Sequence, residues 1–273
     1  MKRYMRYAIG GVIIIVLAGL AATLVHGGSY TVTVTATQNG TTQQSIGATE
    51  GCARFVVSDL LDVGFTNYRL WAGMSRVEPV DDDGVYGSPT IAQIKANPNI
   101  IPWSVWDAQF NRPDSYFWSS GCPGGGAQVS LKDILTALKA NGIKPVVTLR
   151  NVDNNDGPAW AMALNPPNST EDWNEWWEFV FAWVYWANVR NNLDVHDWQV
   201  HNEPDNTGQG WDGTLADYIV YTQQTYDAIK YVYDTYLPGE TFKLYAPVST
   251  HANEWITESL IQNDAILDVV DRM

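Results

Sequence analysis

The most informative stretch of this sequence is Trp198-Gln199-Val200-His201-Asn202-Glu203-Pro204-Asp205. It begins as a short apolar run and ends abruptly in a polar cluster that contains a carboxylic acid. Pro204 lacks a backbone N–H and disfavours a helical conformation at the residue before it, so it helps to end the strand at Glu203. A buried strand that delivers a glutamate to the carboxyl edge of a sheet indicates a catalytic site.

Other short apolar runs precede and follow this strand. They are separated by longer stretches with helical period, and this alternation implies βα units around a parallel sheet. Because each run is short and apolar, we expect strands that are buried on both faces. The expected strands are residues 45–49, 67–71, 145–149, 198–201, 242–247 and 267–270.

Apolar spacing also predicts helices between these strands. From residue 173 to 185 apolar side chains recur at the spacing of one helix face, and residues 215–233 repeat the pattern after the fourth strand. Ser130 with Asp133 predicts a capped helix start, and Gly142 is placed to end that helix.

The connection from residue 72 to 129 is far longer than the few residues usual between a strand and a helix. Long connections of this kind commonly carry binding residues. We expect an insertion that is ordered by aromatic packing and that presents rings such as Trp103 to a substrate.

The triplet Asn202-Glu203-Pro204, at the end of a fourth strand, resembles the superfamily of retaining glycoside hydrolases built on (β/α)8 barrels. The resemblance spans residues 45–273 and is specific mainly at this triplet and at Arg69. It implies an α/β fold, a TIM (β/α)8 barrel that is incomplete, with about strands 1 to 6 present. It further implies that Glu203 is the acid/base catalyst and that Asn202 binds the sugar 2-hydroxyl. We expect no cofactor, and the spacing of the two cysteines does not resemble a metal site.

Arg69 is a charge inside an apolar run, so its burial requires a partner. By the resemblance it holds a nucleophilic carboxylate ionised, and in the superfamily that carboxylate lies on strand seven. The sequence therefore predicts most of a glycosidase fold but does not include the strand that would carry the nucleophile. A structural ion pair of Arg69 with Glu50 or Glu78 is the alternative, and Glu50, Glu78 and Glu254 are weaker candidates for the nucleophile.

Further residues at the expected strand ends are candidates for substrate contact. For each of them a role in the core is the alternative, and for Glu203 the alternative is an exposed loop carboxylate. The candidates besides Asn202 and Arg69 are His201, Trp71, Arg150, Asn151, His251 and, in the insertion, Trp103.

Composition favours one large domain with a carbohydrate substrate. The 273 residues are 45% hydrophobic and 17% charged, which suits one large core. Acidic residues outnumber basic ones 30 to 16, and the net charge of -14 repels phosphate backbones, so a nucleic-acid partner is excluded. The 13 tryptophans fit a site that binds the apolar faces of sugars.

The N-terminus predicts export. Residues 1–29 combine a basic start with an uncharged apolar run, which indicates a cleaved signal peptide or a retained membrane anchor, and residues 30–44 suit a linker. Catalysis would then take place outside the cell or at its surface. Cys52 and Cys122 would form a disulfide there or stay as two thiols.

Two functions follow from these observations. The first is a glycosidase that acts on a β-linked glycoside or polysaccharide. The alternative is a non-catalytic carbohydrate-binding surface protein that keeps the cleft but lacks the nucleophile. Sugar identity and oligomeric state stay open at this point.

Overall fold

The computed structural model describes residues 47–49, 57–78, 84–112, 129–151, 164–206 and 211–250. The chain divides into two compact units, Met1–Gln44 and Ser45–Met273. The expected signal or anchor segment, the linker, both cysteines, His251 and the expected strand 267–270 lie outside the described residues. Among the helices that are described, none is both long and apolar enough to span a membrane.

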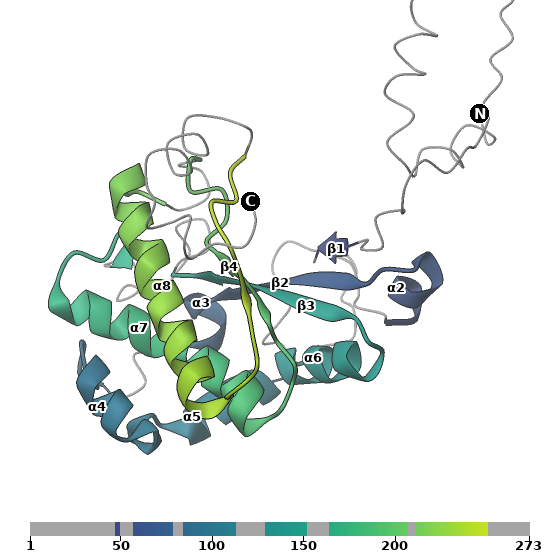
Figure 1. The fold of residues 1–273 in the computed structure, drawn as a ribbon, viewed down its shortest axis with the longest axis horizontal. Coiled ribbons are helices and arrows are strands. Elements are labelled where there is room, and N and C mark those ends of the chain that lie inside the picture. Colours follow the sequence, from purple (N-terminus) through teal and green to yellow (C-terminus); the bar gives the residue numbers. More distant parts are fainter. Residues whose placement is uncertain are drawn as a thin grey trace, which may run out of the picture. The chain divides into compact units, whose positions relative to one another are not determined.

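The centre of the second unit is a parallel sheet of five strands in sequential order (Figure 1). All neighbouring strands pair in parallel. The five strand predictions between residues 45 and 247 are confirmed, with bounds that shift by a few residues. The strands are β1 (Gly47–Thr49), β2 (Asn67–Gly73), β3 (Lys144–Arg150), β4 (Asp197–Val200) and β5 (Lys243–Tyr245).

The prediction of a TIM (β/α)8 barrel with about six strands is wrong. In the part of the chain that the structure describes, the sheet is open, and β1 and β5 are its two edges. A barrel requires its first and last strands to pair, and it requires strand number, tilt and stagger to be consistent with closure. Alternating strands and helices predict a sequential parallel sheet, but that pattern carries no information about closure.

Helices connect the strands. The insertion at residues 72–129, which we expected to be a long loop, contains four of them in its described residues, 72–78 and 84–112. Thr90 begins one with a capping box, because its side chain accepts from the Gln93 N–H and the Gln93 side chain accepts from the Thr90 N–H. The helices of the insertion are α3 (Met74–Val77), α4 (Ile91–Ala96), the 3₁₀ helix η2 (Pro98–Ile100) and α5 (Trp103–Asn111).

The remaining helices agree with the sequence patterns. Ser130 caps the helix after the insertion as expected, and Gly142 follows its end with φ of 67°. The helix predicted at residues 173–185 begins earlier and continues into a π-helix. These helices are α2 (Val57–Val63), α6 (Leu131–Ala140), α7 (Thr170–Val184), the π-helix η4 (Tyr185–Arg190) and α8 (Leu215–Tyr236).

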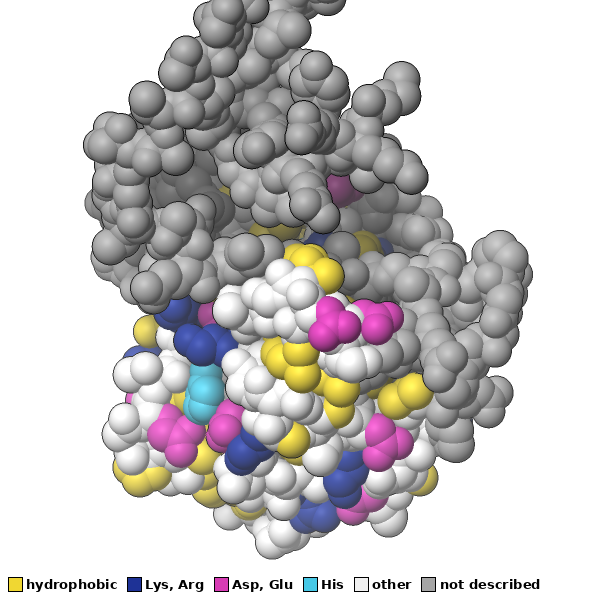
Figure 2. All heavy atoms as spheres, turned by 90° about the vertical axis from the view of Figure 1, so that its right-hand side faces the viewer, with side chains coloured by type: hydrophobic (Ala, Val, Ile, Leu, Met, Phe, Trp, Pro, Cys, Tyr) yellow, Lys and Arg dark blue, Asp and Glu magenta, His cyan; other side chains and the backbone are white. Residues whose placement is uncertain are grey.

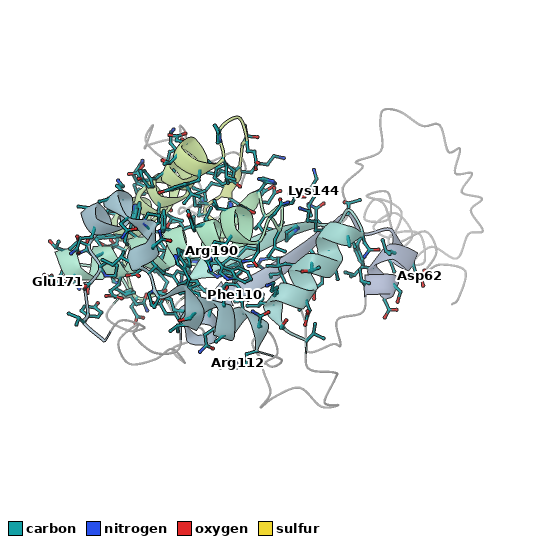
Figure 3. All side chains as sticks on the ribbon, turned by 90° about the horizontal axis from the view of Figure 1, so that it is seen from below. Asp62, Phe110, Arg112, Lys144, Glu171 and Arg190 are labelled. Atoms are coloured by element: carbon teal, nitrogen blue, oxygen red, sulfur yellow. The ribbon has the colours of Figure 1, made fainter. Side chains whose placement is uncertain are left out.

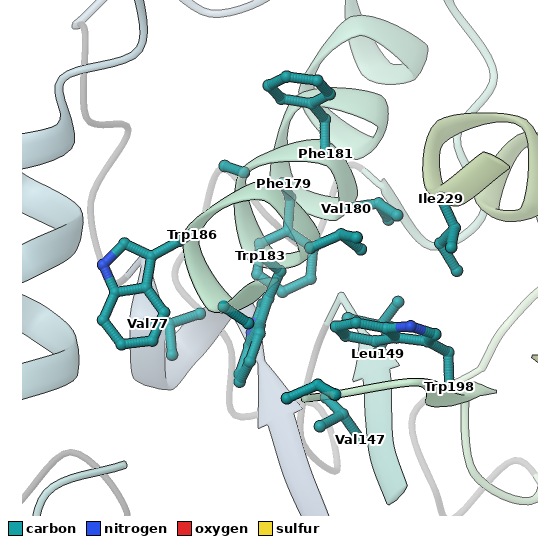
Figure 4. Packing of buried hydrophobic residues seen from close by; sticks show 14 of the residues in the cluster. Val77, Val147, Leu149, Phe179, Val180, Phe181, Trp183, Trp186, Trp198 and Ile229 are labelled. Carbon is teal, nitrogen blue, oxygen red and sulfur yellow. The ribbon is translucent and has the colours of Figure 1, made fainter. Parts of the chain in front are cut away.

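One face of the sheet packs against helices. Leu70, Val147, Trp198 and Leu244 are register partners on four adjacent strands, and all are fully buried. Figure 4 shows Val147 and Trp198 beside side chains of α7 and α8, among them Trp183 and Ile229. The rings of Trp183 and Trp198 meet edge to face at 6.0 Å. Right-handed crossovers between successive parallel strands place the connecting helices on one face of a sheet in sequential order.

The opposite face of the sheet carries polar side chains, where the sequence predicted strands buried on both faces. Arg69 and Thr148 alternate with the core residues of β2 and β3, and Asp197 and Gln199 do so on β4. Thr148, Asp197 and Gln199 are nevertheless buried. The strands therefore carry apolar packing on one side and hydrogen-bonding groups on the other, and the polar side leads to the candidate site.

Candidate functional site

The site begins where β4 leaves the sheet. The His201 N–H still donates to the Leu149 carbonyl at 2.8 Å, so His201 makes the last contact of the strand with β3. The backbone then turns sharply, with φ of 57° at His201 and 46° at Glu203. Residues other than glycine rarely adopt this left-handed region, and such outliers concentrate at functional sites.

Specific hydrogen bonds hold this turn in place. The Gln199 amide donates to the His201 carbonyl at 2.6 Å, and His201 Nδ1 contacts the Asn202 carbonyl at 2.9 Å. The Glu203 N–H donates to the Val248 carbonyl at 2.7 Å, which links the turn to the segment after β5. Contacts with the side chains of Gln199 and His201 and with the Val248 carbonyl therefore hold the strained backbone in place.

Arg69 of β2 reaches across the sheet to this turn. Its Nη2 donates to Asn202 Oδ1 at 2.6 Å, and its Nε donates to Thr148 Oγ1 at 3.1 Å. Its guanidinium also lies 5.0 Å from the Trp71 ring. Bonds from an ionised donor are shorter and stronger than neutral ones, so Arg69 fixes the orientation of the Asn202 amide.

The Glu203 carboxyl lies at the carboxyl edge of the sheet and is half-buried. Asn206 holds it from one side, because Asn206 Nδ2 donates to Glu203 Oε2 at 3.3 Å and the Asn206 N–H donates to the Glu203 carbonyl at 2.9 Å. The neighbouring Asp205 accepts from the Thr250 N–H at 3.0 Å. Glu203 therefore keeps a partly solvated carboxyl on a fixed main chain.

A buried cationic and aromatic layer lies beneath the turn. Arg150 and His201 are fully buried, and the Arg150 guanidinium lies 4.9 Å from the Trp71 ring. Burial and, to a smaller extent, the nearby Arg150 charge together lower the pKa of His201 to about 3. The imidazole is therefore neutral over the ordinary pH range, and its ring packs edge to face on Trp211 at 5.5 Å.

The structure brings most of the predicted site residues together. Arg69, Trp71 and Asn202 form one contact cluster beside Glu203, with His201 and Arg150 beneath. His251 lies outside the described residues.

Two of the predicted residues serve the interior in what the structure describes. Asn151 is buried, and its Nδ2 donates to the Leu164 carbonyl at 2.6 Å. Trp103 belongs to the helical layer, where its ring stacks on Tyr185 at 5.2 Å and its Nε1 donates to the Pro98 carbonyl at 3.0 Å. Neither contact joins the strand-end cluster.

Sequence reasoning missed the residues that hold this cluster in place. Thr148 binds Arg69, Gln199 binds the turn, and Asn206 binds Glu203. Thr148 and Gln199 did carry a signal, because each is a polar residue at alternating positions inside an apolar strand. Asn206 carried none, since its role depends on the turn that follows Pro204.

A separate groove of about 660 Å³ lies at the opposite ends of the strands. It is lined at the beginnings of β3, β4 and β5 by Lys144, Asp197 and Lys243, among others. Figure 2 shows basic, acidic and histidine side chains side by side on one face of the molecule. In Figure 3, Lys144 lies far from Glu171, which belongs to the first turn of α7. Ligands of open parallel sheets bind at the carboxyl ends of the strands, so Glu203 and not this groove marks the candidate site.

No group of three or more His, Cys, Asp or Glu side chains that could hold a metal ion occurs among residues 47–250 where these are described. Comparison with models of known protein families and with curated proteins found no match.

Proposed function

We propose that this protein hydrolyses O-glycosidic bonds by a retaining mechanism, with Glu203 as the acid/base catalyst and a β-linked glycoside or polysaccharide as the substrate. The observation that supports it best is the 2.6 Å bond from Arg69 to Asn202 directly beside Glu203. A glutamate, an amide and a guanidinium from two different strands converge at one strand end, and this is the set of groups that the reaction uses.

The chemistry assigns a role to each group. Glu203 protonates the departing glycosidic oxygen and then removes a proton from the water that releases the sugar. Asn202, oriented by Arg69, binds a sugar hydroxyl next to the anomeric carbon. The retaining path also requires a second carboxylate about 5 Å from the first. We expect that carboxylate in a part of the protein beyond the described residues.

The proposal includes export. An uncharged apolar run after a basic start favours a protein that acts outside the cytoplasm or at the cell surface. Polysaccharides are found there, and a net charge of -14 is compatible with a neutral sugar substrate.

The test compares Glu203→Gln with the unmodified protein, expressed from its gene to the first in-frame stop codon. The substrates are two aryl β-glycosides, one with a reactive leaving group and one with a poor leaving group. A general acid contributes roughly 10²- to 10⁴-fold, so we expect a loss of that size in kcat/KM for the poor leaving group only. Glu240→Gln, a glutamate in the distant groove, is the matched control and should leave both rates unchanged.

Equal loss on both substrates would contradict an acid role for Glu203. Absence of hydrolysis by the unmodified protein, together with saturable binding of oligosaccharides, would instead support a non-catalytic carbohydrate-binding protein. Isothermal titration with the same sugars distinguishes these outcomes.

A further inference from the structure

The peptide unit between Asn202 and Glu203 is held at both ends. Its carbonyl, which belongs to Asn202, lies 2.9 Å from His201 Nδ1. Its N–H, which belongs to Glu203, donates to the Val248 carbonyl at 2.7 Å. A peptide unit is planar, so bonds at both ends fix the direction in which the Glu203 side chain leaves the main chain.

The imidazole of His201 is suited to this task because its Nδ1 lies within hydrogen-bond distance of the Asn202 carbonyl. A carbonyl oxygen can only accept, so the contact requires the hydrogen of the neutral ring to be on Nδ1. The ring is fully buried and packs edge to face on Trp211 at 5.5 Å and on Tyr221 at 6.5 Å. Packing therefore fixes the ring, and the ring fixes the peptide unit.

The turn needs such support. His201 and Glu203 both have positive φ, and left-handed backbone costs a residue other than glycine about 1–2 kcal/mol. Without the His201 contact, the peptide unit could rotate toward an extended conformation and carry Glu203 out of its position. A displacement of about 1 Å at a reacting group can cost about 10²-fold in rate.

We propose that His201 is a positioning residue that fixes the Asn202–Glu203 peptide unit and so acts on the reaction through Glu203. This inference rests on the proposed function. It assigns to a side chain that points into the interior a role that we first expected to be substrate contact.

Two variants of His201 separate this role from a general loss of structure. In His201→Asn the side-chain amide can occupy the place of the ring Nδ1, and asparagine tolerates positive φ. In His201→Gln the amide reaches the place of Nε2, and the donor to the Asn202 carbonyl is lost. Thermal unfolding monitored by circular dichroism verifies that both variants are folded.

We expect His201→Gln to lower kcat/KM about 10²-fold for the poor leaving group and less than about tenfold for the reactive one, because the lost positioning affects proton donation by Glu203. His201→Asn should stay within about tenfold of the unmodified protein on both. Equal losses on the two substrates, or an Asn variant as impaired as the Gln variant, would overturn the inference.

A second measurement does not depend on activity. Long-range ¹H–¹⁵N correlation spectra of the histidine-labelled protein should show His201 as the Nδ1–H tautomer at pH 7. The Nε2–H tautomer would overturn the inference whatever the kinetics. Failure of the proposed function is recognised separately, because Glu203→Gln would then show no dependence on the leaving group.

Discussion

The two faces of the sheet are built from the same strands, but one is held by apolar packing and the other by hydrogen bonds. On the helical face, Leu70, Val147 and Trp198 form a continuous buried row, and their neighbours are the apolar side chains of α7 and α8. On the other face, Arg69 and Thr148 are joined by a hydrogen bond of 3.1 Å and continue toward Asn202.

The difference shows how one strand can serve stability and chemistry together. Because side chains alternate, each residue on β2 and β4 belongs to one face only. The helical face gains stability from area removed from water, which any apolar residue of suitable size supplies. The polar face depends on particular donors and acceptors, so its residues are not exchangeable.

The largest expected effect is on the helical face. Replacing a buried tryptophan by alanine removes a large apolar side chain and leaves a cavity, so we expect Trp198→Ala to lower the free energy of unfolding by about 3–5 kcal/mol. Urea denaturation measures it. Val220→Ala on α8, where the side chain is 46% exposed, is the control and should change stability by less than about 0.5 kcal/mol. Similar values for both would mean that this face does not carry the core.

A smaller effect is expected on the polar face. Lysine cannot reproduce the two bonds of the Arg69 guanidinium, and a hydrogen bond to a charged group contributes about 1.5–3 kcal/mol. We therefore expect Arg69→Lys to lower the free energy of unfolding by about 2 kcal/mol, because Arg69 is half-buried.

The matched control for this variant is Arg190→Lys, at an arginine that pairs with Asp107 at 3.2 Å nearer the surface. Exposed ion pairs contribute little, so a loss below about 1 kcal/mol is expected there. Equal losses in the free energy of unfolding for Arg69→Lys and Arg190→Lys would mean that the polar face does not require a guanidinium at residue 69.

The third prediction concerns pH. The folded pKa of His201 is about 3, below the value of 6.5 for an unperturbed histidine, so the unfolded chain takes up a proton first as the pH falls. The stability contributed by neutral His201 is complete above pH 6.5 and is lost between about pH 6.5 and 3. His201→Asn removes this titration, so its stability should gain on the unmodified protein by up to about 1.4 kcal/mol per pH unit in that window.

Urea denaturation of both proteins at several pH values from 7 to 4 measures this difference. The other ionisable groups are common to both chains and cancel in the comparison. Parallel stability curves would show that His201 is not buried in a neutral form.

The smallest effect has the opposite sign. Glu203 has φ of 46°, a conformation that glycine adopts without strain, so Glu203→Gly should raise the free energy of unfolding by about 0.5–1 kcal/mol while abolishing hydrolysis. Asn192→Gly, at φ of 50°, should gain less because asparagine tolerates this region. A lower free energy of unfolding for Glu203→Gly would mean that the contacts of the Glu203 side chain stabilise the fold by more than its left-handed backbone destabilises it.

The sequence predicts the helical face well and the polar face incompletely. Hydrophobic spacing locates β2 to β5, α7 and α8, because burial of apolar side chains is what selects these elements. The two ends of α6 follow from local side-chain chemistry. The Ser130 side chain accepts from the Asp133 N–H, and Gly142 adopts a positive φ without strain. The short helices of the insertion were missed, although Thr90 and Gln93 form the spacing of a capping box.

Sequence analysis named most of the residues that the structure groups at the strand ends, but it did not predict the hydrogen bonds that hold them in place. Asn202, Glu203 and Arg69 are identifiable because polar residues at strand ends stand out against apolar runs. The left-handed backbone at His201 could not be predicted, since histidine seldom adopts it and the bonds that hold it come from Gln199 and from Val248 on a later segment. Closure of the sheet was likewise not encoded in any local pattern.

The sequential strand order has a consequence for synthesis on the ribosome. Each of the inner strands β2, β3 and β4 pairs with the strand made just before it and with the one made just after it. Domains generally fold from the N-terminus during synthesis, so each βα unit can dock on a finished edge as it leaves the exit tunnel. Strand β4, and with it the turn that carries Glu203, has its β3 partner already synthesised when it leaves the ribosome, and this pairing does not require β5.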